Sequence, residues 1–341
     1  MDAYSAHGAP FALGRALGER ACAAFAEVIR PNPAFERLRR RVPYGWLADV
    51  AARIRADFPN VWNELQGLAA GLEQPFEDVL VWNCRGDITP TDPEGCSSVA
   101  AASSDGIWLA HNGDGDPALR EHCFLVDAVP DDGPAFFTFC YPGSLPGHTL
   151  AMNAAGLAYT VNNLRLTQCP TGIPRMVTAR ALLTCSGVEE ALAVLRRTRR
   201  TGGFHFMMAD SRHRAPVSVE APIQRVSVEA VATVSAHANH LVHPDCAHLP
   251  QRITDSSRAR QARLNAWREQ LNVPATPDAL LAILGDHSDA VLPVHRTDPN
   301  DPDGENTLAT AVFRVDTGGV TASVRTAPNA PVSAKRRFTP T

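Results

Sequence analysis

The sequence predicts an α+β fold, in which helices pack against the faces of antiparallel sheets. Three observations predict it. Hydrophobic residues follow a helical period up to about residue 80, the pattern then changes to short strand-like runs, and two later pairs of helical segments interrupt those runs. The chain shows no regular alternation of single strands and helices of the kind that builds a parallel sheet, and no internal repeat.

The opening segment is expected to be helical. Residues 10–80 carry apolar side chains at helical spacing, interrupted by three prolines, and should form three or four helices. A polar, proline-rich stretch over Thr89–Gly95 then predicts a loop that ends this helical part.

The rest of the chain is expected to build the sheets and the helices that cover them. Short alternating or apolar runs predict strands at 97–101, 106–112, 123–126, 135–140, 149–153, 157–162, 204–209, 216–220, 226–230, 233–237, 308–315 and 320–325. Helical periodicity returns at 176–185, 188–199, 256–271 and 277–284. The tail from Pro328 is expected to be a surface strap or disordered.

Length and composition allow a large core but name no activity. The chain has 341 residues, of which 45% are hydrophobic and 20% charged, enough for two domains or one large layered domain. A net charge of -4 argues against nucleic acid and anionic lipid as partners. The first twenty residues lack a basic segment followed by an apolar one, and no apolar run reaches about 18 residues. We therefore expect a cytoplasmic protein without a membrane segment.

Cys96 is the first candidate for chemistry. The eight cysteines are scattered and include no C-x-x-C pair, so a disulfide framework is not expected and most should be buried as small apolar residues. Cys96 differs because Gly95-Cys96-Ser97-Ser98 comes directly after the predicted loop, where a thiol can be exposed and act as a nucleophile. Taken alone, the pattern also fits an inert residue at the start of a strand.

Two further clusters could bind metal ions, but neither has the required spacing. His237, His240 and His243 stand three residues apart, yet Pro244 and the preceding strand-like run argue against one helix face. The acidic stretches 114–116 and 298–304 lack the ligand pattern of a calcium loop and are expected to be solvated turns. Since nucleotide-binding glycine motifs are absent too, neither a metal nor another cofactor is expected.

Seven segments come one after another in an order and at a spacing typical of one enzyme family: Pro59–Leu72, Pro75–Ile88, Gly95–Ala100, His111–Asp114, Met152–Leu164, His237–His240 and Thr307–Val315. Together they resemble the acyl-coenzyme A:6-aminopenicillanate acyltransferase family of N-terminal nucleophile (Ntn) hydrolases, a cysteine branch that includes β-alanyl-amine hydrolases. The resemblance implies a four-layer αββα sandwich, with two antiparallel sheets between helix layers. It also implies an inactive precursor that cleaves its own Gly95–Cys96 bond, giving a helical α chain of residues 1–95 and a β chain of residues 96–341.

The local chemistry suits this cleavage. Gly95 has no side chain to hinder attack of the Cys96 thiol on its carbonyl, and the loop before it provides an accessible peptide. Hydrolysis of the resulting thioester would free the Cys96 α-amine, whose ordinary pKa is about 7.7–8.0. This amine can take the thiol proton, so no separate catalytic histidine is required.

The resemblance also implies roles for other residues. Asp114 would lie beside the new N-terminus and tune its amine, and Asn239 would stabilise the oxyanion. Asn162, or alternatively Asn163, would be a second donor or substrate contact, and Asn112 in the Asn-x-Asp segment belongs to the same group. A further such residue is Arg296, which would bind a carboxylate or maintain the site.

The sequence departs from the family at two positions. Gly113 replaces an aromatic residue, which would widen the pocket or loosen the strand. Gly304, with Glu305 beside it, stands where penicillin acyltransferases carry a functional arginine. An acidic replacement would suit an amine-bearing or neutral acyl group.

The implied reaction is acyl transfer through a Cys96 thioester. Cys96 would attack a linear amide or thioester, Asn239 would stabilise the oxyanion, and the α-amine would protonate the leaving group. Hydrolysis of a small-molecule amide is favoured because no coenzyme A site is recognisable; the alternative is an acyl-CoA-dependent N-acyltransferase of secondary metabolism. An alternative of another class is an unprocessed, non-catalytic binding member. The expected partners are the small-molecule substrate and the chain's own two fragments, with the oligomeric state left open.

Overall fold

Two sheets face each other in the computed structural model, which describes residues 3–89, 94–104, 106–271 and 275–339. The eight-stranded sheet has the order β1-β4-β5-β6-β7-β8-β9-β10, and the six-stranded sheet the order β11-β2-β3-β12-β13-β14. The first consists of β1 (Ala3–Gly8), β4 (Phe124–Pro130), β5 (Phe136–Cys140), β6 (Leu150–Asn153), β7 (Leu157–Leu164), β8 (Gly203–Asp210), β9 (Val217–Ala221) and β10 (Ser227–Ala230). The second consists of β11 (Val234–His237), β2 (Cys96–Ser103), β3 (Gly106–Gly115), β12 (Asn306–Asp316), β13 (Gly319–Arg325) and β14 (Ala334–Phe338).

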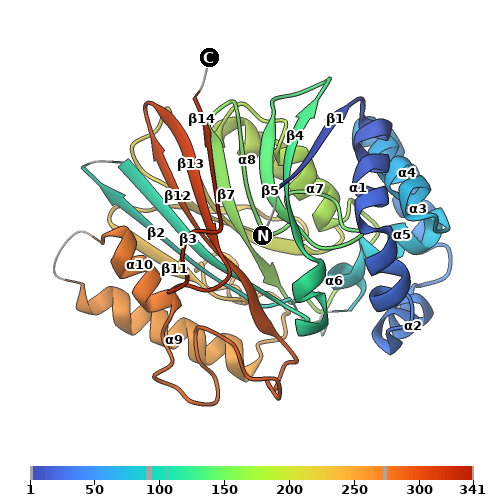
Figure 1. Cartoon of the computed structure of the whole chain (residues 1–341). Helices are drawn as coiled ribbons and strands as arrows, with labels where there is room; N and C mark the ends of the chain where they lie inside the picture. Colours follow the sequence, from blue (N-terminus) through green and yellow to red (C-terminus); the bar gives the residue numbers. More distant parts are fainter. Residues whose placement is uncertain (1–2, 90–93, 105, 272–274, 340–341) are drawn as a thin grey trace.

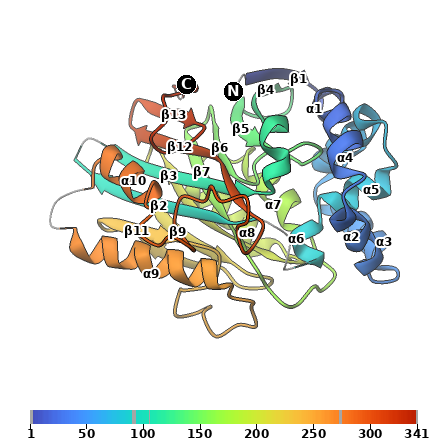
Figure 2. The same cartoon turned by 60° about the horizontal axis from the view of Figure 1, so that its bottom comes forward.

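Helices cover the outer faces of the two sheets and one end of the molecule. The helical elements are α1 (Pro10–Ala24), the π-helical turn η1 (Phe25–Ile29), α2 (Pro33–Arg41), α3 (Trp46–Asp57), α4 (Pro59–Leu72), α5 (Phe76–Trp82), α6 (Arg85–Ile88), the 3-10 turn η2 (Pro117–His122), α7 (Arg175–Leu182), α8 (Val188–Arg197), α9 (Asp255–Gln270) and α10 (Pro277–Leu284). Helices α7 and α8 cover the eight-stranded sheet, α9 and α10 lie against the six-stranded sheet, and α1–α5 gather beside β1 and β4 (Figures 1 and 2). The αββα layering is thus confirmed.

Strand alternation explains how the layers are held together. On β7, Thr160 faces the six-stranded sheet, where its hydroxyl lies 2.8 Å from that of Ser98 on β2. Its neighbour Tyr159 points the other way and donates a hydrogen bond of 2.9 Å to the Ala179 carbonyl of α7. On β2, Val99 joins the apolar cluster with α9 and α10. Successive residues of one strand therefore serve different layers, as the period of two requires.

Three sequence-based expectations were wrong. The chain opens with a strand, because β1 pairs in parallel with β4, so the opening is not all helical and the sheet not purely antiparallel. The tail forms β14, which pairs with β13, and is not a loose strap. Both strands lie at sheet edges, where an existing row of backbone groups recruits a short segment whose own pattern is weak. In the predicted turn at 114–116, Asp114 and Gly115 are instead the buried end of β3, and Asp116 caps the 3-10 turn η2.

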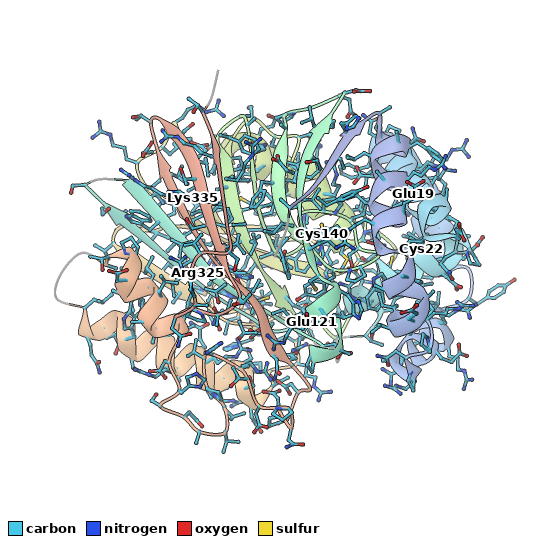
Figure 3. All side chains as sticks on the ribbon, viewed as in Figure 1. Glu19, Cys22, Glu121, Cys140, Arg325 and Lys335 are labelled. Atoms are coloured by element: carbon cyan, nitrogen blue, oxygen red, sulfur yellow. The ribbon has the colours of Figure 1, made fainter. Side chains whose placement is uncertain are left out.

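Side-chain burial follows the layers. Glu19 and Lys335 are exposed, whereas Cys140 on β5 is almost fully buried; Figure 3 labels all three side chains. All eight cysteines are free thiols. Within the described residues, no helix is both long and apolar enough to cross a membrane. Part of the expected loop before Cys96, residues 90–93, lies outside the described residues.

Candidate active site

Cys96 is the first residue of β2, at one end of the six-stranded sheet. It stands opposite Gly113 on β3, and the next residue of β3, Asp114, stands opposite Thr307 on β12. Three adjacent strands therefore bring Cys96, Asp114 and Thr307 together from distant parts of the chain. Cys96 is only 6% exposed in the uncleaved chain.

A backbone donor contacts the carbonyl of the Gly95–Cys96 peptide bond. The Asp114 N–H donates a hydrogen bond of 2.9 Å to the Gly95 carbonyl oxygen. The same N–H also acts on the Cys96 sulfur, where it partly offsets the rise in the pKa of the thiol. A donor on this oxygen would stabilise the negative charge that develops when a nucleophile attacks the Gly95 carbon. The sequence could not reveal this donor because it belongs to the backbone.

Asn239 and Arg260 hold the backbone of Cys96. The Cys96 N–H donates a hydrogen bond of 2.9 Å to Asn239 Oδ1, the oxygen that also accepts one of 2.8 Å from Arg260 Nη2. Arg260 Nη1 lies 2.5 Å from the Cys96 carbonyl oxygen. The side-chain NH2 of Asn239 donates to the Asn163 carbonyl at 3.1 Å. Asn239 therefore presents its oxygen to the nitrogen that cleavage would turn into an amine.

Burial dominates the protonation of the thiol and its neighbouring carboxyl group. Burial, followed by the Asp114 charge, raises the pKa of Cys96 far above its usual value, so the thiol is protonated. Burial also raises the pKa of Asp114 to about 6, against the opposing effect of Arg260. The Thr307 hydroxyl donates to Asp114 Oδ1 at 2.7 Å, whereas Oδ2 has no hydrogen-bond partner in the described part of the chain. Asp114 is thus ionised at neutral pH and has one oxygen free to accept a proton.

Gly95 is packed against a buried ionic cluster. A side chain at Gly95 would overlap the Glu305 carboxylate and would lie 2.8 Å from Arg296 Nη1. Glu305 pairs with both Arg165, at 2.5 Å, and Arg296, which also binds Asp301. Arg296 therefore maintains the packing around Gly95 here. The carboxylate of Glu305 is occupied by two arginines and does not face a substrate as a free charge.

The structure does not bring free amides of Asn162 and Asn112 to Cys96. Asn162 lies between the sheets, where Oδ1 accepts from Ser98 at 2.6 Å and Nδ2 donates to the His237 carbonyl at 3.0 Å. Asn112 Nδ2 donates to the Leu284 carbonyl at 2.8 Å, beside α10. Both side chains are engaged by these partners.

The three histidines of the cluster each contact a different partner. His237 lies 3.0 Å from Glu220, His240 lies 2.8 Å from Ser257, and His243 lies 2.9 Å from Ser218; each distance is measured from a ring nitrogen to a side-chain oxygen. Among residues that the structure describes, no group of three or more His, Cys, Asp or Glu could hold a metal ion.

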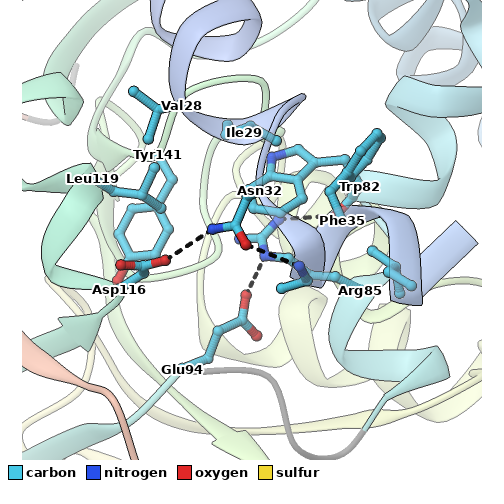
Figure 4. Close-up of a pocket in the computed structure, with 12 residues that line it drawn as sticks. Val28, Ile29, Asn32, Phe35, Trp82, Arg85, Glu94, Asp116, Leu119 and Tyr141 are labelled. Atoms are coloured by element: carbon cyan, nitrogen blue, oxygen red, sulfur yellow. Dashed lines mark hydrogen bonds and ion pairs between the residues drawn. The ribbon is translucent and has the colours of Figure 1, made fainter.

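A concave pocket lies beside the Cys96 site (Figure 4). Tyr141 connects the two, because its hydroxyl donates a hydrogen bond of 3.0 Å to the Asp114 carbonyl. The lining residues are mostly apolar and come largely from the N-terminal helices: Val28, Ile29, Asn32, Ala34, Phe35, Leu38, Trp82, Arg85, Glu94, Asp116, Leu119 and Tyr141. A concave, apolar site with a few polar groups is suited to a small organic molecule.

Sequence reasoning placed Cys96, Asp114 and Asn239 together but missed Arg260. Helix α9 carries four arginines, and from the sequence alone all four are expected to be surface charges. Only the fold shows that Arg260 is completely buried on the side that faces Cys96. The one feature of the sequence that could have indicated a buried Arg260 is Ser256, four residues earlier on the helix. Its hydroxyl accepts a hydrogen bond of 3.1 Å from Arg260 Nε.

Comparisons with known proteins found one matching family and a similar hydrolase. Residues 101–327, about two thirds of the chain, match the family described as acyl-coenzyme A:6-aminopenicillanic acid acyl-transferase. The matched range begins just after Cys96. The chain is also similar to the β-alanyl-dopamine/carcinine hydrolase of Drosophila melanogaster, with 29% identity over 164 residues. That alignment covers 42% of this chain and 42% of the relative, so less than half of the relative's length is matched.

Proposed function

Because the chain belongs to the acyl-coenzyme A:6-aminopenicillanic acid acyl-transferase family, we propose that it is a self-processing amidohydrolase whose nucleophile is Cys96. Family membership and the similarity to a hydrolase support amide cleavage or acyl transfer in general. One observation carries the specific proposal: the Gly95 carbonyl that precedes Cys96 accepts a hydrogen bond from the Asp114 N–H, which also acts on the Cys96 sulfur.

Self-cleavage is the first step of the proposal. The Cys96 sulfur attacks the Gly95 carbonyl carbon and a C–S bond forms, while the C–N bond between the two residues breaks. The thiol proton passes to Asp114 and then to the Cys96 nitrogen, which becomes an amine. Water hydrolyses the thioester, so the Gly95 carboxylate ends an α chain of residues 1–95 and the thiol is restored at the start of a β chain of residues 96–341.

Turnover of the substrate uses the same groups. The Cys96 amine, held by Asn239 Oδ1, takes the thiol proton as the sulfur attacks the substrate carbonyl. The Asp114 N–H, no longer engaged by Gly95, then stabilises the oxyanion, and the Asn239 NH2 uses the hydrogen that does not bond the Asn163 carbonyl as a second donor. The ammonium protonates the leaving amine, and water then releases the acyl group from sulfur. Asp114 and Arg260 set the charge around this exchange.

Acyl transfer to a second acceptor is the competing reaction, favoured by the description of the matched family. It differs from hydrolysis only in whether an amine or water attacks the thioester. We place the reaction in the cytoplasm, which is supported by eight cysteines that form no disulfide.

A substrate screen tests the proposal. Amine release from penicillins, N-acyl amino acids and β-alanyl amines is measured with the native protein and with Cys96→Ala. We expect release from at least one class, lost by more than about a thousandfold in the variant. Adding hydroxylamine reports the thioester intermediate, because it attacks the acyl group on sulfur and forms an acyl hydroxamate. Release that is unchanged in Cys96→Ala would contradict the proposal.

A further inference from the structure

Arg85 and Arg175 form a buried pair of cations beside Glu94. What we infer from this pair rests on the proposed self-cleavage. We propose that these two arginines form a carboxylate-binding subsite for the acyl group of the substrate, and that Glu94 occupies this subsite in the uncleaved chain. Glu94 directly precedes Gly95, so its carboxylate belongs to the first acyl group that Cys96 would attack.

Both arginines contact the Glu94 carboxylate directly. Arg85 Nε lies 2.5 Å from one oxygen, and Arg175 Nη2 pairs with the other. Arg85 is 3% exposed and Arg175 is 1% exposed, so both charges are withdrawn from water. Ion pairs in such surroundings are strong only when each charge keeps its partner. The Arg85 and Arg175 pair thus needs an anion.

The pair is rigidly positioned. Arg85 stacks on Trp82 at 4.2 Å and donates to the Ser144 hydroxyl at 3.0 Å. Arg175 stacks on Phe204 at 4.6 Å and crosses Gly86, where any side chain would overlap its guanidinium. Held guanidinium groups bind planar carboxylates with little loss of side-chain entropy.

Hydrogen bonds also connect the cation pair to the Cys96 site. Arg175 Nη1 donates a hydrogen bond to the side-chain oxygen of Asn163. The backbone carbonyl of Asn163 accepts the hydrogen bond from the Asn239 side chain. Asn239 in turn accepts from the Cys96 N–H. One residue, Asn163, therefore separates the carboxylate subsite from the group that holds the nucleophile.

Departure of Glu94 would leave the subsite with a net positive charge. Asp87 accepts from the Arg175 N–H at 3.3 Å and from Thr201 at 2.6 Å, and so supplies one negative charge beside the pair. Once Glu94 has moved, the two positive charges of Arg85 and Arg175 are balanced by only the one negative charge of Asp87. An incoming carboxylate restores neutrality, whereas an amine would add repulsion.

The pocket reaches one member of the pair, Arg85. Arg85 and Glu94 both line the apolar pocket beside the Cys96 site, as do Asn32 and Asp116 (Figure 4). Cleavage frees Glu94 from its covalent link to Cys96, so a substrate entering this pocket can exchange with it. The favoured acyl group copies the Glu94–Gly95 segment: a carboxylate separated from the scissile carbonyl by the same chain of atoms, as in an N-glutarylglycyl amide.

Binding to uncleaved protein tests the subsite without requiring activity. Three proteins are compared by thermal unfolding in glutarate and in its neutral analogue glutaramide: Cys96→Ala, Cys96→Ala/Glu94→Ala, and the latter with Arg175→Gln. We expect glutarate to raise Tm by roughly 2 °C or more only in the double variant, where the arginines have lost Glu94. Equal shifts in Cys96→Ala and the double variant, or shifts by glutaramide as large as by glutarate, would overturn the proposal.

Kinetics of the processed native protein give a second test, which holds even if the Glu94→Ala variant does not fold. We expect kcat/KM for N-glutarylglycyl-p-nitroanilide to exceed that of its carbamoyl counterpart by about tenfold or more. Arg85→Met should reduce this ratio to near one, while Arg263→Met, at the half-buried Arg263–Asp286 pair on α9, keeps it. Equal rates for both compounds would overturn the subsite but leave the proposed function intact, whereas an unprocessed native chain would defeat the function itself.

Discussion

Gly95 occupies a position where the fold leaves no room for a side chain. Its Cα faces the Glu305 carboxylate and Arg296, and the two charges are fixed by further ion pairs. We expect Gly95→Ala to displace the Gly95 carbonyl from the Asp114 N–H and to slow self-cleavage at least about tenfold. Gly113→Ala is the control, because a Cβ there meets only ordinary contacts of 3.5 Å or more. Equal processing of both variants on a denaturing gel would contradict the role of this packing.

Asp114 makes self-cleavage depend on pH. Burial raises the pKa of its carboxyl group to about 6, so the fraction able to accept the thiol proton grows as pH rises through that value. Precursor refolded at a series of pH values between about 4.5 and 8 should cleave slowly below about pH 5 and reach a plateau above about pH 7. Asp114→Asn should be slower by about a hundredfold or more and should lose this profile. An unchanged profile in the variant would assign the proton transfer to another group.

The residues at the site differ in how far the sequence could reveal them. Cys96 and Asp114 stand in short segments whose residue types suit their chemistry, and the fold does bring them together. Arg260 and Arg175 could not be predicted, because an arginine reads as a surface charge until its burial is known. Glu305 was expected to act on the substrate, but two arginines engage it, and only the fold brings Arg165 to it.

At the scale of elements, α1 and α4 touch through their backbones. Side chains at Gly14 or Gly67 would overlap main-chain atoms of the opposite helix, and the same holds for Gly18 and Gly71. We expect Gly67→Ala to destabilise the protein by about 2 kcal/mol or more, since the overlapping atoms belong to a rigid helix. Denaturant unfolding measures this, with Gln66→Ala on the exposed side of α4 as the control. A Gly67→Ala variant as stable as the control would contradict the close packing.

Elements were predictable where a segment pairs with neighbours on both sides. Every residue of β7 and β8 is buried between layers, and α8 buries one face, so the short runs of the strands and the helical period of α8 are strong patterns. The edge strands β1 and β14 bury only part of their side chains, and their patterns resemble those of loops. These two strands form because they pair with strands of a sheet, and that pairing cannot be inferred from the few residues around each of them.

At the scale of the whole molecule, the proposed fragments are interlocked. Residues 1–95 contribute β1 to the eight-stranded sheet and line much of the substrate pocket, while β2 begins directly after them. We therefore expect the two fragments to elute together in size-exclusion chromatography after cleavage and to separate only in denaturant. Separation under native conditions would show that the contacts of β1 and α4 do not hold the fragments together.

The intact mass of the purified protein tests the central claim most directly. If Cys96 is an N-terminal nucleophile, mass spectrometry in denaturant will find two fragments that meet at Gly95–Cys96, with Cys96 as the first residue of the larger one. Cys96→Ala will remain a single chain of 36.7 kDa. A native protein that hydrolyses amides while its mass stays at 36.7 kDa would contradict the account.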